Sequence, residues 1–149
     1  MKSISKVFIL CLFTIIASSC VKKIIDDILP SGSASIVANG NTINLGKPTA
    51  VTLLGVVTIE AMKDKNGFTL LLNKSDIKTG KTYDLKSSTG VFTFLYDGAY
   101  YSPSTGTLEI TKFTDNKIVE GKFSFDGSVV GISNKKMTAT GTFSIDIVL

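Results

Sequence analysis

Hydrophobic and polar residues alternate with a period of two along most of the chain after residue 34. Such alternation is typical of strands that have one face in a core and the other in water. The clearest run is at the C-terminus, where one face carries Met137, Ala139, Gly141, Phe143, Ile145, Ile147 and Leu149. No convincing helical period occurs in this part of the sequence. The pattern predicts a single all-β domain over residues 34–149.

Short turn motifs divide the alternating segments into hairpins. Asn39-Gly40 and Asp97-Gly98 are residue pairs that two-residue hairpin turns favour, so we expect Ala38 opposite Asn41. Alternation continues from Val51 to Met62, which predicts one long strand. In total the chain is expected to form about nine or ten antiparallel strands in meander order, folded as a sandwich or a flattened barrel.

One later hairpin has a register that the sequence itself supports. Its strands are expected over 107–113 and 118–125, with Phe113 opposite Ile118. This register places Ile110 opposite Gly121, Glu109 opposite Lys122 and Thr111 opposite Glu120. Apolar residues then meet apolar ones and an acid meets a base, which is the pairing that stabilises a ladder.

The first 33 residues have a different pattern. A basic start, an 11-residue apolar run over 7–17 and small residues at 17–19 predict a secretory signal peptide over residues 1–19. Eleven apolar residues are too few to span a bilayer. Ala17-Ser18-Ser19-Cys20 resembles the lipobox of bacterial lipoproteins, although Leu is usual where Ala17 stands. The resemblance implies that Cys20 is lipidated, the alternative being plain secretion with Cys20 at the cleavage site.

Residues 20–33 are interpreted as the lipidated cysteine and a tether. Ile24, Ile25, Ile28 and Leu29 fall on one helical face before Pro30 ends the pattern. Two structures are possible for the tether: a short amphipathic turn that lies on the membrane or packs on the domain, or a disordered linker. Val21 follows Cys20 in place of the Asp that resembles an inner-membrane retention signal, which favours the outer membrane, on either its periplasmic or its outer face.

The amino-acid composition argues against most of the usual kinds of catalytic site. The chain has no His, no Trp and no Arg, and its only cysteines are Cys11 and Cys20. The domain therefore lacks a disulfide, a thiol nucleophile and the commonest metal ligands, and no metal or cofactor is expected. Removing Lys2 and Lys6 from the 16 lysines leaves 14 against 12 acidic residues, a balance too weak for a nucleic-acid partner.

Three groups of side chains remain as candidate sites. Tyr96, Tyr100 and Tyr101 cluster at one predicted hairpin, where they either contact a ligand or partner or cap the core. Glu109 and Glu120 share the polar face of paired strands, which allows a two-carboxylate hydrolase or an ordinary solvated ladder. Asp64-x-Asn66-Gly67 resembles the start of a calcium loop, but turn chemistry explains it without an ion.

The last two thirds of the chain resemble a family of small uncharacterised lipoproteins of Gram-negative bacteria. Three segments carry the resemblance: Tyr101-Ser102 through Ile110-Thr111, Gly121-Lys122-Phe123-Ser124-Phe125, and Gly141-Thr142-Phe143. Gly80-Lys81-Thr82-Tyr83-Asp84-Leu85 is similar to the family's Gly-x-Tyr-x-Leu segment. Lys122 stands where Thr is usual. The resemblance implies an all-β lipoprotein and brings no catalytic residues.

These observations favour a lipid-anchored, non-catalytic envelope protein that acts as a binding or assembly module. Its partners would be the membrane, through the N-terminal lipid, and an envelope protein or a glycan. A carbohydrate-binding accessory lipoprotein is the alternative reading, and a carboxylate-dependent hydrolase is a third. The repeated Gly-x-Phe-Ser phrases of residues 121–126 and 141–146 are interpreted as packing rather than as a binding motif.

Overall fold

The computed structural model describes residues 32–86, 91–115 and 117–146. The signal peptide, Cys20 and the tether up to residue 31 lie outside the described residues. The described chain forms β1 (Gly32–Ala38), β2 (Asn41–Gly46), β3 (Thr49–Leu53), β4 (Val56–Lys63), β5 (Asn66–Asn73), a 3-10 turn η1 (Lys74–Asp76), β6 (Thr82–Asp84), β7 (Val91–Tyr96), β8 (Ala99–Thr114), β9 (Ile118–Val129) and β10 (Ile132–Asp146).

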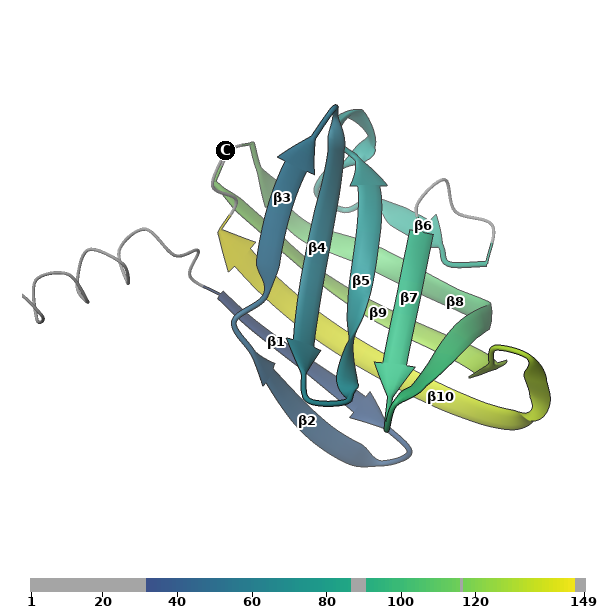
Figure 1. The fold of residues 1–149 in the computed structure, drawn as a ribbon. Coiled ribbons are helices and arrows are strands. Elements are labelled where there is room, and N and C mark those ends of the chain that lie inside the picture. Colours follow the sequence, from purple (N-terminus) through teal and green to yellow (C-terminus); the bar gives the residue numbers. More distant parts are fainter. Residues whose placement is uncertain (1–31, 87–90, 116, 147–149) are drawn as a thin grey trace, which may run out of the picture.

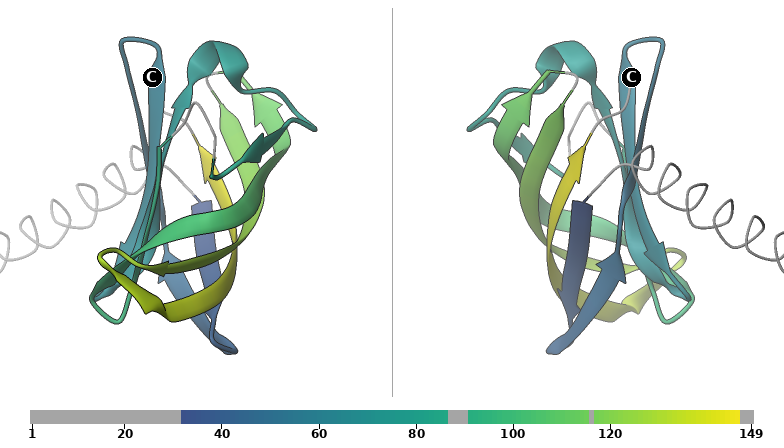
Figure 2. Two further views of the ribbon diagram at one scale, coloured as in Figure 1. Left: turned by 90° about the vertical axis from the view of Figure 1, so that its right-hand side faces the viewer. Right: turned by 90° about the vertical axis from the view of Figure 1, so that its left-hand side faces the viewer.

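All ten strands belong to one antiparallel sheet that curls into a half-barrel, which confirms the all-β prediction. The order along the sheet is β2-β1-β10-β9-β8-β7-β5-β4-β3, and β6 pairs with β8. The sheet folds over so that β3, β4, β5 and β7 lie across the layer of β1, β2, β8, β9 and β10 (Figures 1 and 2). Most neighbours follow the expected meander. Two departures are β6, which leaves β5 to pair with β7, and β1, which pairs with β10 from Gly32 opposite Ile145 to Ala38 opposite Ala139.

Phenylalanine rings fill the space between the two layers. Phe68 and Phe123 lie with ring centroids 4.9 Å apart, and Phe94 and Phe125 lie at the same separation, both pairs edge-on. Such edge-to-face pairs add to the stabilisation that burial provides. The aliphatic core residues surround these rings, among them Ile36, Ile59, Leu70, Leu108, Ile110 and Ile145.

Glycines opposite phenylalanines explain the repeated phrase. Gly121 lies opposite Phe143, and Gly141 lies opposite Phe123, because β9 and β10 pair antiparallel. A Cβ atom on Gly141 would stand 2.3 Å from the Phe123 ring, and one on Gly121 would stand 2.5 Å from the Phe143 ring. Each ring thus occupies the space over the neighbouring glycine, which confirms the packing interpretation.

The predicted strand Val51–Met62 is wrong, because it is a hairpin. β3 ends at Leu53, β4 begins at Val56, and Leu54-Gly55 forms a two-residue turn between them. The apolar alternation runs through this turn, so the sequence carries no polar turn signal there. The break also separates two environments: Val57 and Ile59 on β4 are buried, whereas Val51 and Leu53 on β3 are exposed.

Other registers agree with the sequence more closely. Ala38 lies opposite Asn41 and Ile36 opposite Ile43, as the Asn39-Gly40 turn predicts. Glu109 lies opposite Lys122 and Ile110 opposite Gly121. The expected pairing of Thr111 with Glu120 is wrong, because a bulge between Ile110 and Lys112 places Lys112 opposite Glu120. Beyond the bulge Phe113 pairs with Val119 instead of Ile118.

Two ends of the half-barrel can be distinguished. The upper end in Figure 1 carries the β3–β4 turn, η1 and the β8–β9 turn, while the lower end carries the β1–β2, β4–β5, β7–β8 and β9–β10 turns. The upper elements are joined, because the Lys74 amide donates to the Gly55 carbonyl at 2.7 Å and the Lys74 ammonium lies 3.1 Å from Asp115. β1 runs toward the lower end, so the chain enters β1 from the side opposite the lower turns.

Candidate functional site

The three candidate tyrosines lie on the β7–β8 hairpin at the lower end. Its Asp97-Gly98 turn is held against the β4–β5 turn: the Gly98 amide donates to the Lys65 carbonyl, and the Asp97 amide donates to Asn66 Oδ1, each at 3.0 Å. Asn66, proposed above as part of a calcium-like sequence, therefore uses its side-chain oxygen to join two turns.

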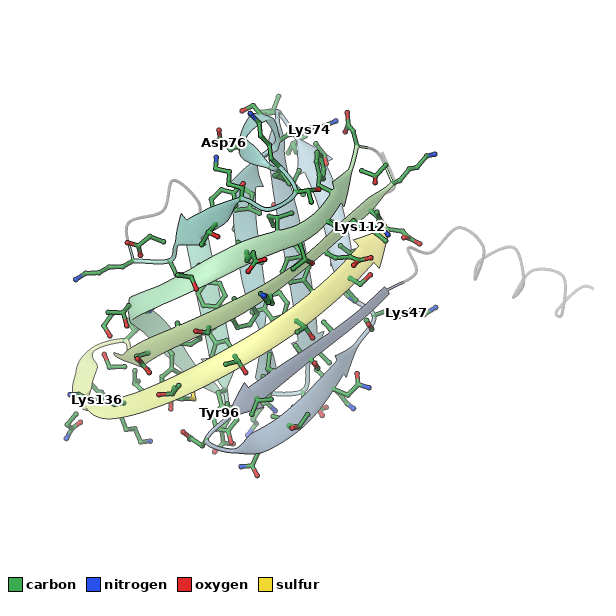
Figure 3. The ribbon with its side chains drawn as sticks, turned by 180° about the vertical axis from the view of Figure 1, so that it is seen from behind. Lys47, Lys74, Asp76, Tyr96, Lys112 and Lys136 are labelled. Carbon is green, nitrogen blue, oxygen red and sulfur yellow. The ribbon has the colours of Figure 1, made fainter. Side chains whose placement is uncertain are left out.

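The tyrosines do not form one stacking platform. Tyr101 lies opposite Phe94 and is only 8% exposed, so its ring belongs to the core. Tyr96 is half-buried at the lower end (Figure 3), and its hydroxyl accepts a hydrogen bond from Asn41 Nδ2 at 3.4 Å. Tyr100 lies opposite Leu95 and is 55% exposed. Of the three rings, Tyr100 is the one that presents a large surface to a ligand.

An apolar groove lies beside Tyr100, and it arises from the way β8 changes partner. β8 pairs with β7 only from Ala99 to Tyr101, and then continues along β9. The first residues of β7 are therefore left beside a hollow of about 520 Å³. It is lined by Phe92, Thr93, Tyr100, Tyr101, Ser102, Val129 and Val130. We call this hollow the Tyr100 groove.

The Tyr100 groove continues onto the β9–β10 turn. A second hollow shares Ser102, Val129 and Val130 with it and extends to Gly131 and Ile132. Val130 is 63% exposed, and Ile132 is half exposed beside it. The Val130 amide donates to the Tyr100 carbonyl at 2.9 Å, which fixes the turn against β8. Sequence reasoning identified Tyr100 but missed Val130 and Ile132, because the alternation gives no sign of which strand ends remain uncovered.

The two candidate carboxylates are each paired with a lysine. Glu109 Oε2 lies 3.0 Å from Lys122 Nζ, and Glu120 Oε1 lies 3.5 Å from Lys112 Nζ. The two pairs stand in different rows of the ladder, Glu109 opposite Lys122 and Glu120 opposite Lys112. Exposed pairs of this kind contribute little to stability and solvate the sheet surface. The arrangement does not bring the two carboxylates together as an acid and its partner base.

A broad hollow of about 800 Å³, with both polar and apolar residues in its lining, lies on the outer face of the sheet toward the lower end. Its lining includes Asn39, Ser104, Asp126, Lys136 and Thr138. Thr138 Oγ1 donates to Asp126 Oδ1 at 2.5 Å, and Ser104 Oγ donates to the Asp126 carbonyl at 2.9 Å. Figure 3 shows this hydroxyl-bearing outer face of β1 and β8–β10, with Lys136 at its lower edge. We call it the Asp126 hollow.

One titratable side chain with a shifted pKa is a structural tyrosine, Tyr83 on β6. Burial raises the pKa of the Tyr83 hydroxyl, and the nearby charge of Asp76 raises this pKa further. The hydroxyl donates to the Asp76 carbonyl at 2.5 Å, and Lys81 Nζ stands 4.9 Å from the ring centroid. Tyr83 thus fastens β6 to η1, and its environment favours the neutral form that can donate this bond.

Comparison with known proteins supplies no family for this chain. No protein-family model matches the sequence, and no curated protein matches it. Over the described residues, no set of three or more His, Cys, Asp or Glu side chains is grouped closely enough to hold a metal ion. The same part of the chain contains no helix with the length and apolar character needed to cross a membrane.

Proposed function

We propose that the protein is a lipid-anchored, non-catalytic binding module of the outer membrane, which holds a segment of an envelope protein in the Tyr100 groove. The anchor is the lipid on Cys20 that the lipobox-like segment implies. The observation that carries the binding role is the groove itself, where an exposed tyrosine and exposed aliphatic side chains surround a hollow. Apolar hollows with exposed apolar rims are the common form of protein and ligand sites.

The edge of β7 makes an extended segment the best-suited occupant. Phe94 is the first residue of β7 that pairs with β8, so Phe92 and Thr93 precede the shared ladder. An added strand would satisfy backbone groups there and place alternate side chains against Tyr100 and Val130. Aromatic residues such as Tyr100 supply much of the binding energy in interfaces of this kind.

Catalysis is left out of the proposal because the two candidate carboxylates are each paired with a lysine. Glu109 and Glu120 are held by Lys122 and Lys112 on the outer face of the sheet. The Tyr100 groove is lined by aromatic, aliphatic and hydroxyl side chains. Such a lining suits recognition of an apolar segment.

A matched pair of variants tests the groove. The full chain is recovered from its native envelope in mild detergent, and co-purifying proteins are identified by mass spectrometry. Val130→Asn is expected to reduce recovery of the partner about tenfold, since burial of an aliphatic side chain contributes about 1.5 kcal/mol or more. Met62→Asn is the control, because Met62 on β4 is 40% exposed and lies outside the groove. Binding in the groove is contradicted if both variants reduce recovery of the partner equally, or if neither variant reduces it.

The anchor is tested separately by metabolic labelling with palmitate. The wild-type protein is expected to take up label, and Cys20→Ala is expected to abolish it. An unlabelled wild-type protein would contradict the anchor while leaving the groove experiment informative.

A glycan is the second candidate ligand, and the Asp126 hollow favours it. Asn39, Asp126, Lys136 and Thr138 offer the mixture of donors and acceptors that sugar hydroxyls require. Binding of envelope polysaccharide fragments, measured by calorimetry, is expected to fall with Lys136→Ala and to be unchanged with Val130→Asn. The reverse result would assign sugar binding to the Tyr100 groove.

A further inference from the structure

The tip of the β3–β4 hairpin is the most exposed apolar feature among the described residues. Leu54 is 95% exposed and Leu53 is 69% exposed, and Val51 stands beside them on β3. We call these three residues the leucine tip. The β3–β4 turn projects at the upper end of the molecule, whereas the β7–β8 hairpin that bears Tyr100 turns at the lower end (Figures 1 and 2).

The backbone conformation of the β3–β4 turn does not explain why residue 54 is a leucine. Leu54 has φ 51° and Gly55 has φ 80°, a left-handed pair that a two-residue turn requires. In the described chain the other non-glycine residues with positive φ are Asn39, Asp64 and Asp97. Asn and Asp tolerate this conformation, whereas a branched residue such as Leu is strained in it. The fold therefore selects against leucine here, and the exposed side chain has no core contact that would offset the strain.

The surroundings of the tip are rich in lysine. Lys74 is bonded through its amide to Gly55 in the turn, and its ammonium pairs with Asp115. Exposed Lys78 follows η1, and exposed Lys117 lies in the β8–β9 turn. Aliphatic side chains with lysines behind them match the boundary between the acyl chains and the anionic headgroups of a membrane.

We propose that the leucine tip inserts into the same lipid surface that holds the Cys20 anchor, as a second membrane contact. The inference rests on the proposed lipid anchor. Residues 20–31 span at most ~40 Å when extended, so the anchor keeps the domain close to the bilayer. Three side chains fall well short of the roughly 800 Å² that each partner buries in a stable protein interface. A protruding tip of this size fits fluid lipid better than the surface of a protein.

The test uses the absence of tryptophan from the chain. Leu53→Trp places a single tryptophan, which can be excited selectively over the tyrosines, at the tip without changing the strained residue. The full chain is purified as the cell processes it and mixed with vesicles of phosphatidylethanolamine and phosphatidylglycerol, with and without brominated acyl chains. Leu53→Trp is expected to shift to shorter wavelength and to be quenched by the brominated lipid. Val130→Trp, at an apolar site of the lower end that is 63% exposed against 69% for Leu53, is the matched control and is expected to show neither change.

A second substitution links the signal to Leu54. Leu54→Asn in the Leu53→Trp background introduces a residue that suits the turn. It is expected to lower the ratio of vesicle-inserted to free protein about tenfold. Quenching that is equal for the Leu53 and Val130 reporters overturns the proposal. A spectral shift that depends on protein concentration, without vesicles, also overturns it and assigns the tip to a second copy of the chain. Mass spectrometry of the same preparations shows whether Cys20 carries lipid, so failure of the anchor and failure of the tip are read separately.

Discussion

The β1–β2 and β3–β4 turns have nearly the same backbone and very different residues. Asn39-Gly40 adopts φ 50° and 79°, and Leu54-Gly55 adopts φ 51° and 80°. In the first turn the residue is asparagine, which the left-handed conformation favours. In the second it is a large aliphatic residue whose side chain is in water. The difference separates a turn that is explained by folding from one that needs an explanation outside the fold.

The glycines of the two turns provide the largest expected effect. A Cβ atom on either Gly40 or Gly55 meets no other atom within 4 Å, so a substitution there is resisted by the backbone alone. Gly40→Val and Gly55→Val are each expected to lower the free energy of unfolding by about 2 kcal/mol, because a branched residue is strained at positive φ. Urea denaturation measures both. Losses that differ widely would show that the two turns are not equivalent in geometry.

The next largest effect on the free energy of unfolding is expected from the hydrogen bonds that join the β3–β4 turn to η1 and β6. Tyr83 is bonded to Asp76 of η1, and η1 is bonded to Gly55 through the Lys74 amide. Tyr83→Phe is expected to cost about 1 kcal/mol, the usual contribution of such a hydrogen bond. Gly40 has no corresponding bond to a neighbouring element among the described turn and loop contacts. Denaturation of Tyr83→Phe at neutral pH checks this value.

The same tyrosine makes stability depend on alkaline pH. Its pKa is raised in the folded protein, so the folded state holds the hydroxyl proton more tightly than the unfolded state does. The stabilisation is complete below the unfolded pKa of about 10 and is lost as pH rises through the folded value. Tyr83→Phe should reduce this loss. An unchanged alkaline transition in the variant would show that another group causes it.

A smaller effect is expected when the residue of one turn is placed in the other. Asn39→Leu copies the β3–β4 turn into the β1–β2 turn and is expected to lower the free energy of unfolding by about 0.5–1 kcal/mol. It also adds an exposed leucine at the lower end, where no vesicle binding is expected to result. New binding by Asn39→Leu would mean that any exposed leucine suffices, and that the position of the leucine tip is unimportant.

The fold was predictable where local chemistry and tertiary structure agree. Alternation and the Asn39-Gly40 turn gave the all-β class and the first register, and charge pairing gave Glu109 opposite Lys122. The β3–β4 turn was missed because Leu54 stands in a continuous apolar run over residues 53–57, where a polar turn residue would have marked the break. The pairing of β1 with β10 was missed because residues so distant in sequence leave no local signal of contact.

The candidate sites were harder to predict than the fold. Tyr96, Tyr100 and Tyr101 are close in sequence, but successive residues of a strand point to opposite faces, and Tyr101 is consequently buried while Tyr100 is exposed. The Tyr100 groove depends on the place where β8 leaves β7, which the sequence marks only by Ser102-Pro103. Exposed Val130 likewise follows from the position of the β9–β10 turn beside β8.

One variant tests the central claim about the leucine tip most directly, because folding and membrane contact should respond to it in opposite directions. Leu54→Asn is measured by thermal denaturation in solution and, beside the Leu53→Trp reporter, by insertion into anionic vesicles. The account predicts a higher melting temperature, since Asn suits φ 51°, together with an inserted-to-free ratio about tenfold lower. A lower melting temperature with unchanged insertion would contradict it, because Leu54 would then serve the fold and not the membrane.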